Sequence, residues 1–182
     1  AGTRRVVEQL GCPVAEIREP GTLDGGDVLK IGDTVYVGRG GRTNAEGIAQ
    51  LRRILGPLGA RVVAVPVTQV LHLKTAVTAL PDGTVIGYPD YVDEPGLFER
   101  FLPVPEPHGT AVVCLSAHEL VISASAPRTA EMLRDLGYTV TETPLSEFEK
   151  LEGCPTCLSV RVRNLDGTRD SSRARCVLAC GW

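Results

Sequence analysis

The sequence predicts an α/β fold assembled from repeated strand–strand–helix–strand units. Three segments, residues 4–17, 51–67 and 130–145, each read as an amphipathic helix, then Leu-Gly, then a β-rich strand. In each segment the glycine follows the last helical leucine, where a helix end favours a residue that tolerates positive φ. A unit of this size cannot bury an apolar face alone, so we expect several units to stack around a common axis.

Two of the three copies extend further along the chain. A strand, an Arg-Thr pair, a helix and a second strand follow one another in residues 34–65 and again in residues 120–143. Between them, residues 72–89 predict two strands about a Pro-Asp-Gly turn, and residues 95–101 predict a short helix. Residues 111–117 predict the strand that closes this middle unit.

The two ends of the chain depart from this repeat. The first predicted element is a helix without strands before it, so the chain is expected to begin within a unit. After residue 163 the sequence is polar and lacks clear periodicity. We therefore predict a folded domain of residues 1–163 and an irregular tail of residues 164–182.

Composition narrows the classes of protein to consider. The net charge of -3 provides no basic footprint for nucleic acid, and no run approaches the roughly 18 apolar residues of a membrane span. The N-terminal stretch lacks the continuous apolar segment of a signal peptide. Six cysteines without such a signal indicate reduced thiols. A cytoplasmic protein is the resulting expectation.

Two stretches carry side chains suited to chemistry. Asp24 and Asp27 flank a Gly-Gly pair just before a predicted strand, and such a pair lets the backbone approach a ligand closely. The same carboxylates could instead cap local N–H groups in a polar turn. His72 lies between two leucines at the head of an apolar segment, where it is either functional or a hydrogen-bonded core residue. His108 and His118 have polar, loop-like surroundings and are expected at the surface.

A glycine-rich stretch, residues 38–44, leads into a predicted helix. Thr43 or Asn44 can cap that helix. The loop is short for a phosphate cradle and lacks the Walker lysine, which argues against nucleotide binding. Arg42 can grip a carboxylate with two hydrogen bonds, or it is an ordinary solvated charge.

Cys154 and Cys157 stand in C-x-x-C spacing. They could be a redox pair, a metal-binding pair, or a nucleophile with a neighbour. A zinc site would need Cys176 and Cys180 as well, but these have C-x-x-x-C spacing in the irregular tail. A thioredoxin-like pair would be followed by a helix, whereas a strand-like run follows here. The spacing therefore favours neither a zinc site nor a thioredoxin-like redox pair.

Four stretches, LDGGDVL, GRTN, LHLK and LEGCPTCLSV, occur in this order. Together they strongly resemble the dimethylarginine dimethylaminohydrolases, within the guanidino-modifying superfamily that includes arginine deiminase. The resemblance covers about residues 1–163. It implies a five-bladed α/β propeller of ββαβ units, the pentein fold.

The resemblance also implies roles for individual residues. Cys157 matches the nucleophile, His72 the general acid/base, and Asp24 the carboxylate that orients the histidine. Arg42 matches an arginine that binds the α-carboxylate of the substrate. Leu151 matches a position whose backbone carbonyl meets the amino acid end of the substrate.

The implied reaction is hydrolysis of asymmetric dimethylarginine or monomethylarginine to citrulline and a methylamine. It proceeds through an S-alkylthiouronium intermediate on Cys157 and needs no metal and no organic cofactor. The implied partner is the small methylarginine substrate, and the oligomeric state stays open. Arginine deiminases carry HLD where this chain carries HLK, so Lys74 favours the dimethylarginine branch.

The family also grips the guanidinium with acidic residues, in an Asp-then-Glu-Asp pattern, that precede the segments matched here. We therefore expect this chain to be the C-terminal portion of such an enzyme. It would lack roughly the first one to two blades and be inactive alone. The alternatives are a catalytically dead substrate-binding fragment, or another guanidino-group enzyme such as an arginine deiminase or an amidinotransferase.

Overall fold

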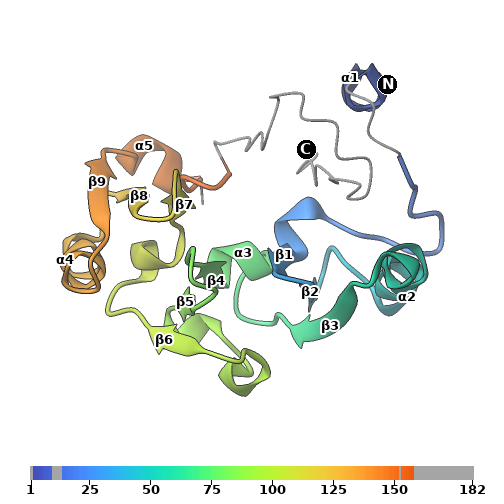
Figure 1. The fold of residues 1–182 in the computed structure, drawn as a ribbon, viewed down its shortest axis with the longest axis horizontal. Coiled ribbons are helices and arrows are strands. Elements are labelled where there is room, and N and C mark those ends of the chain that lie inside the picture. The colour runs from blue at the N-terminus through green and yellow to red at the C-terminus, as the bar shows by residue number, and fades with distance from the viewer. Residues whose placement is uncertain (1, 10–13, 152, 158–182) are drawn as a thin grey trace.

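Three small sheets follow one another along the chain and lie along an arc (Figure 1). The structure is a computed structural model that describes residues 2–9, 14–151 and 153–157. Each sheet has three strands in chain order, of which the first pair is antiparallel and the second pair is parallel. The predicted α/β class is confirmed. The described residues form no closed barrel.

The elements alternate as the repeat predicts. The strands are β1 Val28–Ile31, β2 Thr34–Arg39, β3 Arg61–Pro66, β4 Val77–Ala79, β5 Val85–Gly87, β6 Phe101–Pro103, β7 Val113–Cys114, β8 Glu119–Ser123 and β9 Thr139–Thr143. The α-helices are α1 Gly2–Gln9, α2 Ala45–Leu55, α3 Leu73–Ala76, α4 Pro127–Asp135 and α5 Ser146–Glu149. The 3-10 turns are η1 Gly25–Asp27, η2 Gly56–Leu58, η3 Pro89–Tyr91, η4 Pro95–Leu97 and η5 Pro107–Thr110.

Two of the predicted helix ends are confirmed. Gly59 and Gly137 have φ values of 80° and 91°, in the left-handed region that favours glycine. The first of these ends is longer than predicted, because the turn η2 separates the end of α2 from Gly59. Gly11, the third predicted cap, lies outside the described residues, as does the predicted tail of residues 164–182.

The middle unit differs from its prediction in three places. The residues after His72 form the short helix α3 before β4 begins. In place of the helix predicted over residues 95–101, the chain forms the 3-10 turn η4 and then enters β6 at Phe101. The strand within residues 111–117 is β7, which opens the third sheet instead of closing the second. The closing strand is β6, which pairs in parallel with β5. β6 has only three residues and ends in a proline, so its sequence is too short to show the alternation of a strand.

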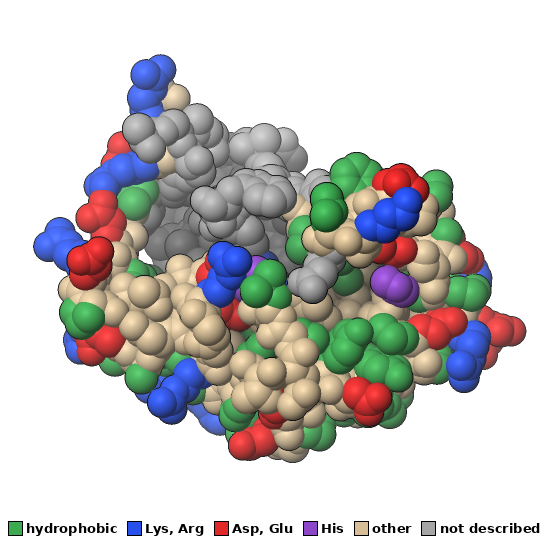
Figure 2. Space-filling view, turned by 180° about the vertical axis from the view of Figure 1, so that it is seen from behind, with side chains coloured by type: hydrophobic (Ala, Val, Ile, Leu, Met, Phe, Trp, Pro, Cys, Tyr) green, Lys and Arg blue, Asp and Glu red, His purple; other side chains and the backbone are tan. Residues whose placement is uncertain are grey.

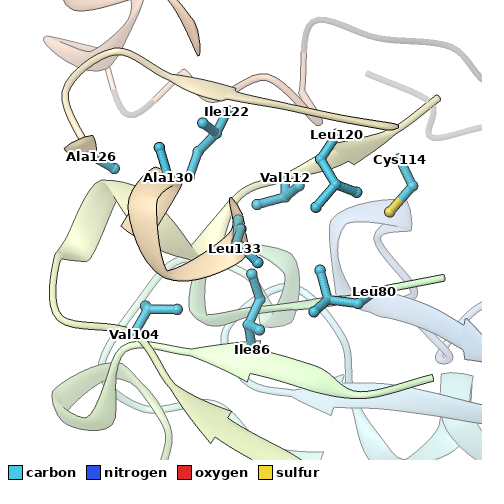
Figure 3. Close-up of a cluster of buried hydrophobic side chains, with 10 residues drawn as sticks. All are labelled: Leu80, Ile86, Val104, Val112, Cys114, Leu120, Ile122, Ala126, Ala130 and Leu133. Atoms are coloured by element: carbon cyan, nitrogen blue, oxygen red, sulfur yellow. The ribbon is translucent and has the colours of Figure 1, made fainter. Parts of the chain in front are cut away.

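One apolar cluster joins the second and third sheets (Figure 3). Leu80 and Ile86 come from the hairpin of the second sheet, and Leu120 and Ile122 come from β8. Leu133 of α4 points between them, and all five side chains are at most 4% exposed. Burying each such side chain stabilises the fold by roughly 1.5–3 kcal/mol, so this cluster holds the two sheets together.

On the face shown in Figure 2, acidic and basic side chains of the described residues are interspersed. None of the helices in the described part of the chain is long and apolar enough to cross a membrane.

Candidate active site

Asp24 and His72 come from two loops that meet beside the first sheet. Asp24 directly precedes η1 and His72 directly precedes α3, and these two elements contact each other. The Nε2 atom of His72 lies 3.3 Å from Oδ2 of Asp24, with the side chains 20% and 27% exposed. Among the described residues Nε2 has no well-aligned hydrogen-bond partner. Charge therefore holds the pair whenever the imidazole is protonated.

Asp24 caps a local turn, which is one of the two interpretations of the sequence, and it also contacts His72. Its Oδ1 atom accepts a hydrogen bond of 2.8 Å from the N–H of Gly26, which caps η1. Partial burial raises the pKa of Asp24, but this hydrogen bond and the charges of His72 and Arg42 outweigh it and leave the pKa lowered. The carboxylate is thus ionised at neutral pH and can orient the imidazole.

Gly26 leaves the space that the His72 ring occupies. A Cβ atom at this position would lie 2.6 Å from Cγ and 2.7 Å from Cδ2 of His72. Contacts this short force the ring to move, since real carbon atoms pack at about 3.5–4.0 Å. The Gly-Gly pair therefore matters here because it admits a neighbouring side chain closely.

A buried carboxylate, Asp27, ties the two loops to a third. Asp27 is 1% exposed. Its Oδ1 atom accepts from the N–H of Leu73 at 3.0 Å, and its Oδ2 atom accepts from the hydroxyl of Thr43 at 2.6 Å. The same hydroxyl accepts from the N–H of Asp24 at 3.0 Å. This network fixes the backbone on either side of the Asp24–His72 pair. Sequence reasoning missed it.

The loop that contains Arg42 ends in the helix cap of α2. Asn44 is the N-cap: its side chain accepts from the N–H groups of Gly47 at 2.8 Å and Thr22 at 3.0 Å. Thr43 is instead fully buried in the network of Asp27. Arg42 itself is exposed, with its charge within electrostatic reach of Asp24. It therefore lies at the rim of the site.

Helix α5 is anchored to the third sheet ahead of the cysteines. The Glu149 carboxylate accepts hydrogen bonds from the hydroxyls of Ser123 and Ser125, the latter at 2.7 Å, and lies 3.7 Å from Nδ1 of His108. Burial raises the pKa of Glu149, but these hydrogen bonds and the charge of His108 outweigh it and leave the pKa lowered. An ionised Glu149 thus holds α5 in place. His108 is exposed as predicted, yet it faces this anchor.

Cys154 and Cys157 lie in one turn after α5. The N–H of Cys157 donates to the carbonyl of Cys154 at 3.0 Å. Their Sγ atoms are 3.0 Å apart, and Sγ of Cys154 is also 3.1 Å from the hydroxyl of Thr156. Cys157 is exposed and Cys154 is partly buried. The two thiols are therefore direct partners, although unequal in exposure.

This contact divides the charge of the pair unevenly. The hydrogen bond with Cys157, helped by the Thr156 hydroxyl and two backbone N–H groups, lowers the pKa of Cys154 to about 6 against the effect of burial. The same contact, together with burial and repulsion from Cys154, raises the pKa of Cys157. The charge of His72 acts on Cys157 in the opposite direction. The contact therefore favours a thiolate on Cys154 over one on Cys157.

The structure brings several predicted residues within reach of one another, and Leu151 is among those that are exposed. Asp24 and His72 are in contact, while Arg42 and Cys157 lie within electrostatic reach of one or the other. Leu151 is 86% exposed. The described residues contain no group of three or more His, Cys, Asp or Glu side chains that could hold a metal ion. The tail cysteines of the zinc alternative lie outside those residues.

Comparison with known proteins gives consistent similarities. A family model described as arginine deiminase matches residues 8–114. An N(G),N(G)-dimethylarginine dimethylaminohydrolase of Streptomyces coelicolor is 66% identical over 165 residues, which cover 91% of this chain and 64% of the relative. A protein of the same description from Pseudomonas aeruginosa is 38% identical over 151 residues, covering 81% of this chain and 59% of the relative.

A solved structure is similar over most of the chain. It is a cysteine-to-serine mutant of DDAH from Pseudomonas aeruginosa complexed with citrulline, with a TM-score of 0.74 and 31% identity. The alignment covers 86% of this chain and 64% of that one. This chain thus spans about three-fifths of the length of these relatives.

Proposed function

Because this chain belongs to the arginine deiminase family, we propose that it carries the catalytic residues of a dimethylarginine dimethylaminohydrolase. The resemblance predicted from the four motifs is confirmed by the relatives. The observation that carries the proposal is the Asp24–His72 contact at 3.3 Å, with the Cys157 thiol within electrostatic reach of His72. A cysteine, a histidine and an orienting carboxylate form the constellation that activates a thiol nucleophile.

The three sheets are then three blades of a five-bladed α/β propeller. The share of the relatives' length that the chain spans supports this, since the rest of the length would supply the first one to two blades. The guanidinium-binding acids would come from that part. The tail of residues 164–182 would lie outside the propeller, and the enzyme would act in the cytoplasm.

The reaction begins with attack on the guanidinium carbon of the substrate. A thiolate on Cys157 forms the C–S bond, and the cationic substrate stabilises that thiolate over the one on Cys154. Proton exchange along the 3.0 Å Sγ–Sγ contact delivers the charge to Cys157. His72 protonates the departing dimethylamine, and the C–N bond breaks to leave an S-alkylthiouronium adduct.

Hydrolysis completes the cycle. His72, now neutral, takes a proton from a water molecule that attacks the adduct carbon. The C–S bond then breaks, the second proton of that water passes to solvent, citrulline is released, and the Cys157 thiolate is regenerated. Asp24 holds the imidazole in one orientation through both steps and stabilises its charged form. Burial of the ring behind Gly26 keeps it in that orientation.

Two further residues would bind the amino acid end of the substrate. Arg42, exposed at the rim, can pair with the α-carboxylate through two hydrogen bonds. The backbone carbonyl of Leu151 can accept a hydrogen bond from the α-amino group. Both are within a few residues of an anchored element, since Asn44 caps α2 and Glu149 ties down α5.

The direct test is product identification with the complete natural protein. Incubation with asymmetric dimethylarginine is expected to release citrulline and dimethylamine in equal amounts. Citrulline and ammonia formed preferentially from arginine would instead assign an arginine deiminase, and amidine transfer to an added amine would assign an amidinotransferase. The 182-residue chain alone is expected to show no turnover, because the guanidinium-binding acids would be missing. A thermal shift with methylarginines but no turnover of the complete protein would contradict the hydrolase.

Replacing Gly26 by alanine is expected to lower the kcat/KM for citrulline formation about 100-fold, since a displacement of about 1 Å at a catalytic group has effects of that size. The added methyl group would push the imidazole away from Asp24. The matched control is Gly41→Ala in a neighbouring loop, where a Cβ meets nothing within 4 Å. Equal kcat/KM values for the two variants would show that the position of the ring is not limiting.

A further inference from the structure

The turn that holds Cys154 and Cys157 places two thiols closer than a van der Waals contact between sulfur atoms. Their Sγ atoms are 3.0 Å apart, and the backbone hydrogen bond of 3.0 Å between the same two residues keeps the turn closed. A disulfide requires an S–S distance of about 2.0 Å. Bond formation thus needs the sulfurs to approach by about 1 Å, which a rotation of the side chains within one turn can provide.

We propose that Cys154 and Cys157 form a reversible redox-modification site, which a peroxide-class oxidant converts to an intramolecular disulfide. The site shares Cys157 with the proposed reaction, but its own chemistry does not depend on that reaction. Only the consequence for turnover rests on the proposed function.

The oxidation takes two steps and needs only peroxide. The Cys157 thiolate attacks one oxygen of hydrogen peroxide, the O–O bond breaks, and Cys157 becomes a sulfenic acid while hydroxide leaves. The Cys154 sulfur then attacks the sulfur of Cys157. The S–S bond forms, the S–O bond breaks, and the second oxygen leaves as hydroxide. The two thiol protons convert both hydroxides to water, so the dithiol loses two electrons and peroxide gains them.

Exposure and charge favour this reaction at the described pair. Cys157 is exposed and so accessible to a small oxidant, whereas Cys114 is buried in β7. A thiolate is the reactive form, and the pair holds one near neutral pH because the contact lowers the pKa of Cys154 to about 6. Proton exchange between the two sulfurs places that charge on the exposed atom for part of the time.

The disulfide would stop the proposed hydrolysis. In the disulfide the Cys157 sulfur is bonded to Cys154 and is no longer a thiolate, so it cannot attack a guanidinium carbon. Turnover is therefore lost until a thiol reductant restores the dithiol. The turn itself needs no rearrangement, because its ends are already joined by a hydrogen bond. Cys154 therefore acts as a resolving thiol that protects Cys157 from further oxidation.

Peptide mass measurement tests the site directly. The complete reduced protein is treated with hydrogen peroxide, its remaining thiols are blocked with iodoacetamide, and it is digested with trypsin. Cleavage after Lys150 and Arg161 yields one peptide, residues 151–161, whose only cysteines are the pair. We expect this peptide to be lighter than the unblocked dithiol by two hydrogen atoms. Dithiothreitol should reverse the change.

Three variants make the result specific. Cys154→Ser and Cys154→Ala remove the resolving thiol, so peroxide should carry Cys157 on to sulfinic acid, heavier by two oxygen atoms and unaffected by dithiothreitol. Cys114→Ser should form the disulfide as the unaltered protein does. An unaltered protein that gives sulfinic acid without disulfide, stays unmodified, or joins Cys157 to another cysteine would overturn the proposal.

Turnover is measured on the same samples before and after oxidation. Complete loss of citrulline formation on oxidation and its recovery on reduction are expected. Turnover that persists in fully disulfide-bonded protein would overturn the regulatory consequence. If the reduced protein forms no citrulline at all, the proposed function fails, while the peptide masses still decide the redox site.

Discussion

Replacement of Cys157 by serine is expected to lower the kcat for citrulline formation from asymmetric dimethylarginine by about 10⁴-fold or more, as for other catalytic nucleophiles. A serine hydroxyl has a pKa far above that of a thiol, so it stays protonated at neutral pH and attacks the guanidinium carbon far more slowly. The side chain is exposed in a surface turn, and its exchange leaves the apolar clusters untouched. The thermal midpoint should therefore change little.

The control for this variant is a cysteine elsewhere in the fold. Cys114 is buried within the cluster of the third sheet, with its Sγ atom 3.5 Å from the carbonyl of Ala79. Cys114→Ala should lower stability modestly and keep the kcat. Steady-state assays of citrulline formation measure the kcat of both variants. Citrulline formation by Cys157→Ser within tenfold of the unaltered protein would rule out Cys157 as the nucleophile.

The alternation of strands and helices was predictable because it depends on local patterns. Gly59 and Gly137 end their segments at positive φ, as the Leu-Gly repeat indicates. The middle unit was harder because its elements are short: α3 has four residues and β6 three, with prolines at and after the end of the strand. Such elements are determined by neighbours in space, here the parallel partner β5. Their sequence alone has too few residues to show a period.

The candidate site divides in a similar way. Asp24, His72 and Cys157 could be proposed from the sequence because each lies in a motif that resembles a known family. Their supporting residues could not, because Asp27, Thr43 and Glu149 act through contacts across 16 to 46 residues of chain. The Gly-Gly pair was a usable signal for close approach, but the approaching group is a histidine ring, not a ligand.

The Cys154–Cys157 spacing illustrates the limit of a motif. C-x-x-C suggested a pair, and the resemblance assigned a nucleophile with a bystander. The 3.0 Å contact between the sulfurs makes Cys154 a direct partner of Cys157 and lowers the pKa of Cys154 to about 6. Neither the spacing nor the family motif specifies that contact, because it depends on the turn that follows the anchored helix α5.

The buried carboxylate of Asp27 is expected to contribute most to the stability of the site. Asp27→Ala removes both acceptor oxygens at once. The buried N–H of Leu73 and the buried hydroxyl of Thr43 then lose the acceptors to which they donate. We expect it to lower the free energy of unfolding by about 3 kcal/mol, since each buried donor that loses its acceptor costs roughly 1–3 kcal/mol. Turnover should fall too, because the loops of Asp24 and His72 lose their common tether.

Two further substitutions separate the lost hydrogen bonds from other effects of the alanine. Asp27→Asn keeps an oxygen for the N–H of Leu73 but turns an amide toward Thr43, so we expect a loss of about 1 kcal/mol. Asp33→Ala removes a carboxylate from the exposed turn between β1 and β2, and its effect should stay within about 0.5 kcal/mol. Urea unfolding with an unchanged m-value measures all three. If Asp27→Ala is no more destabilising than Asp33→Ala, the three loops must be held together by other contacts, and the Asp24–His72 geometry would not depend on Asp27.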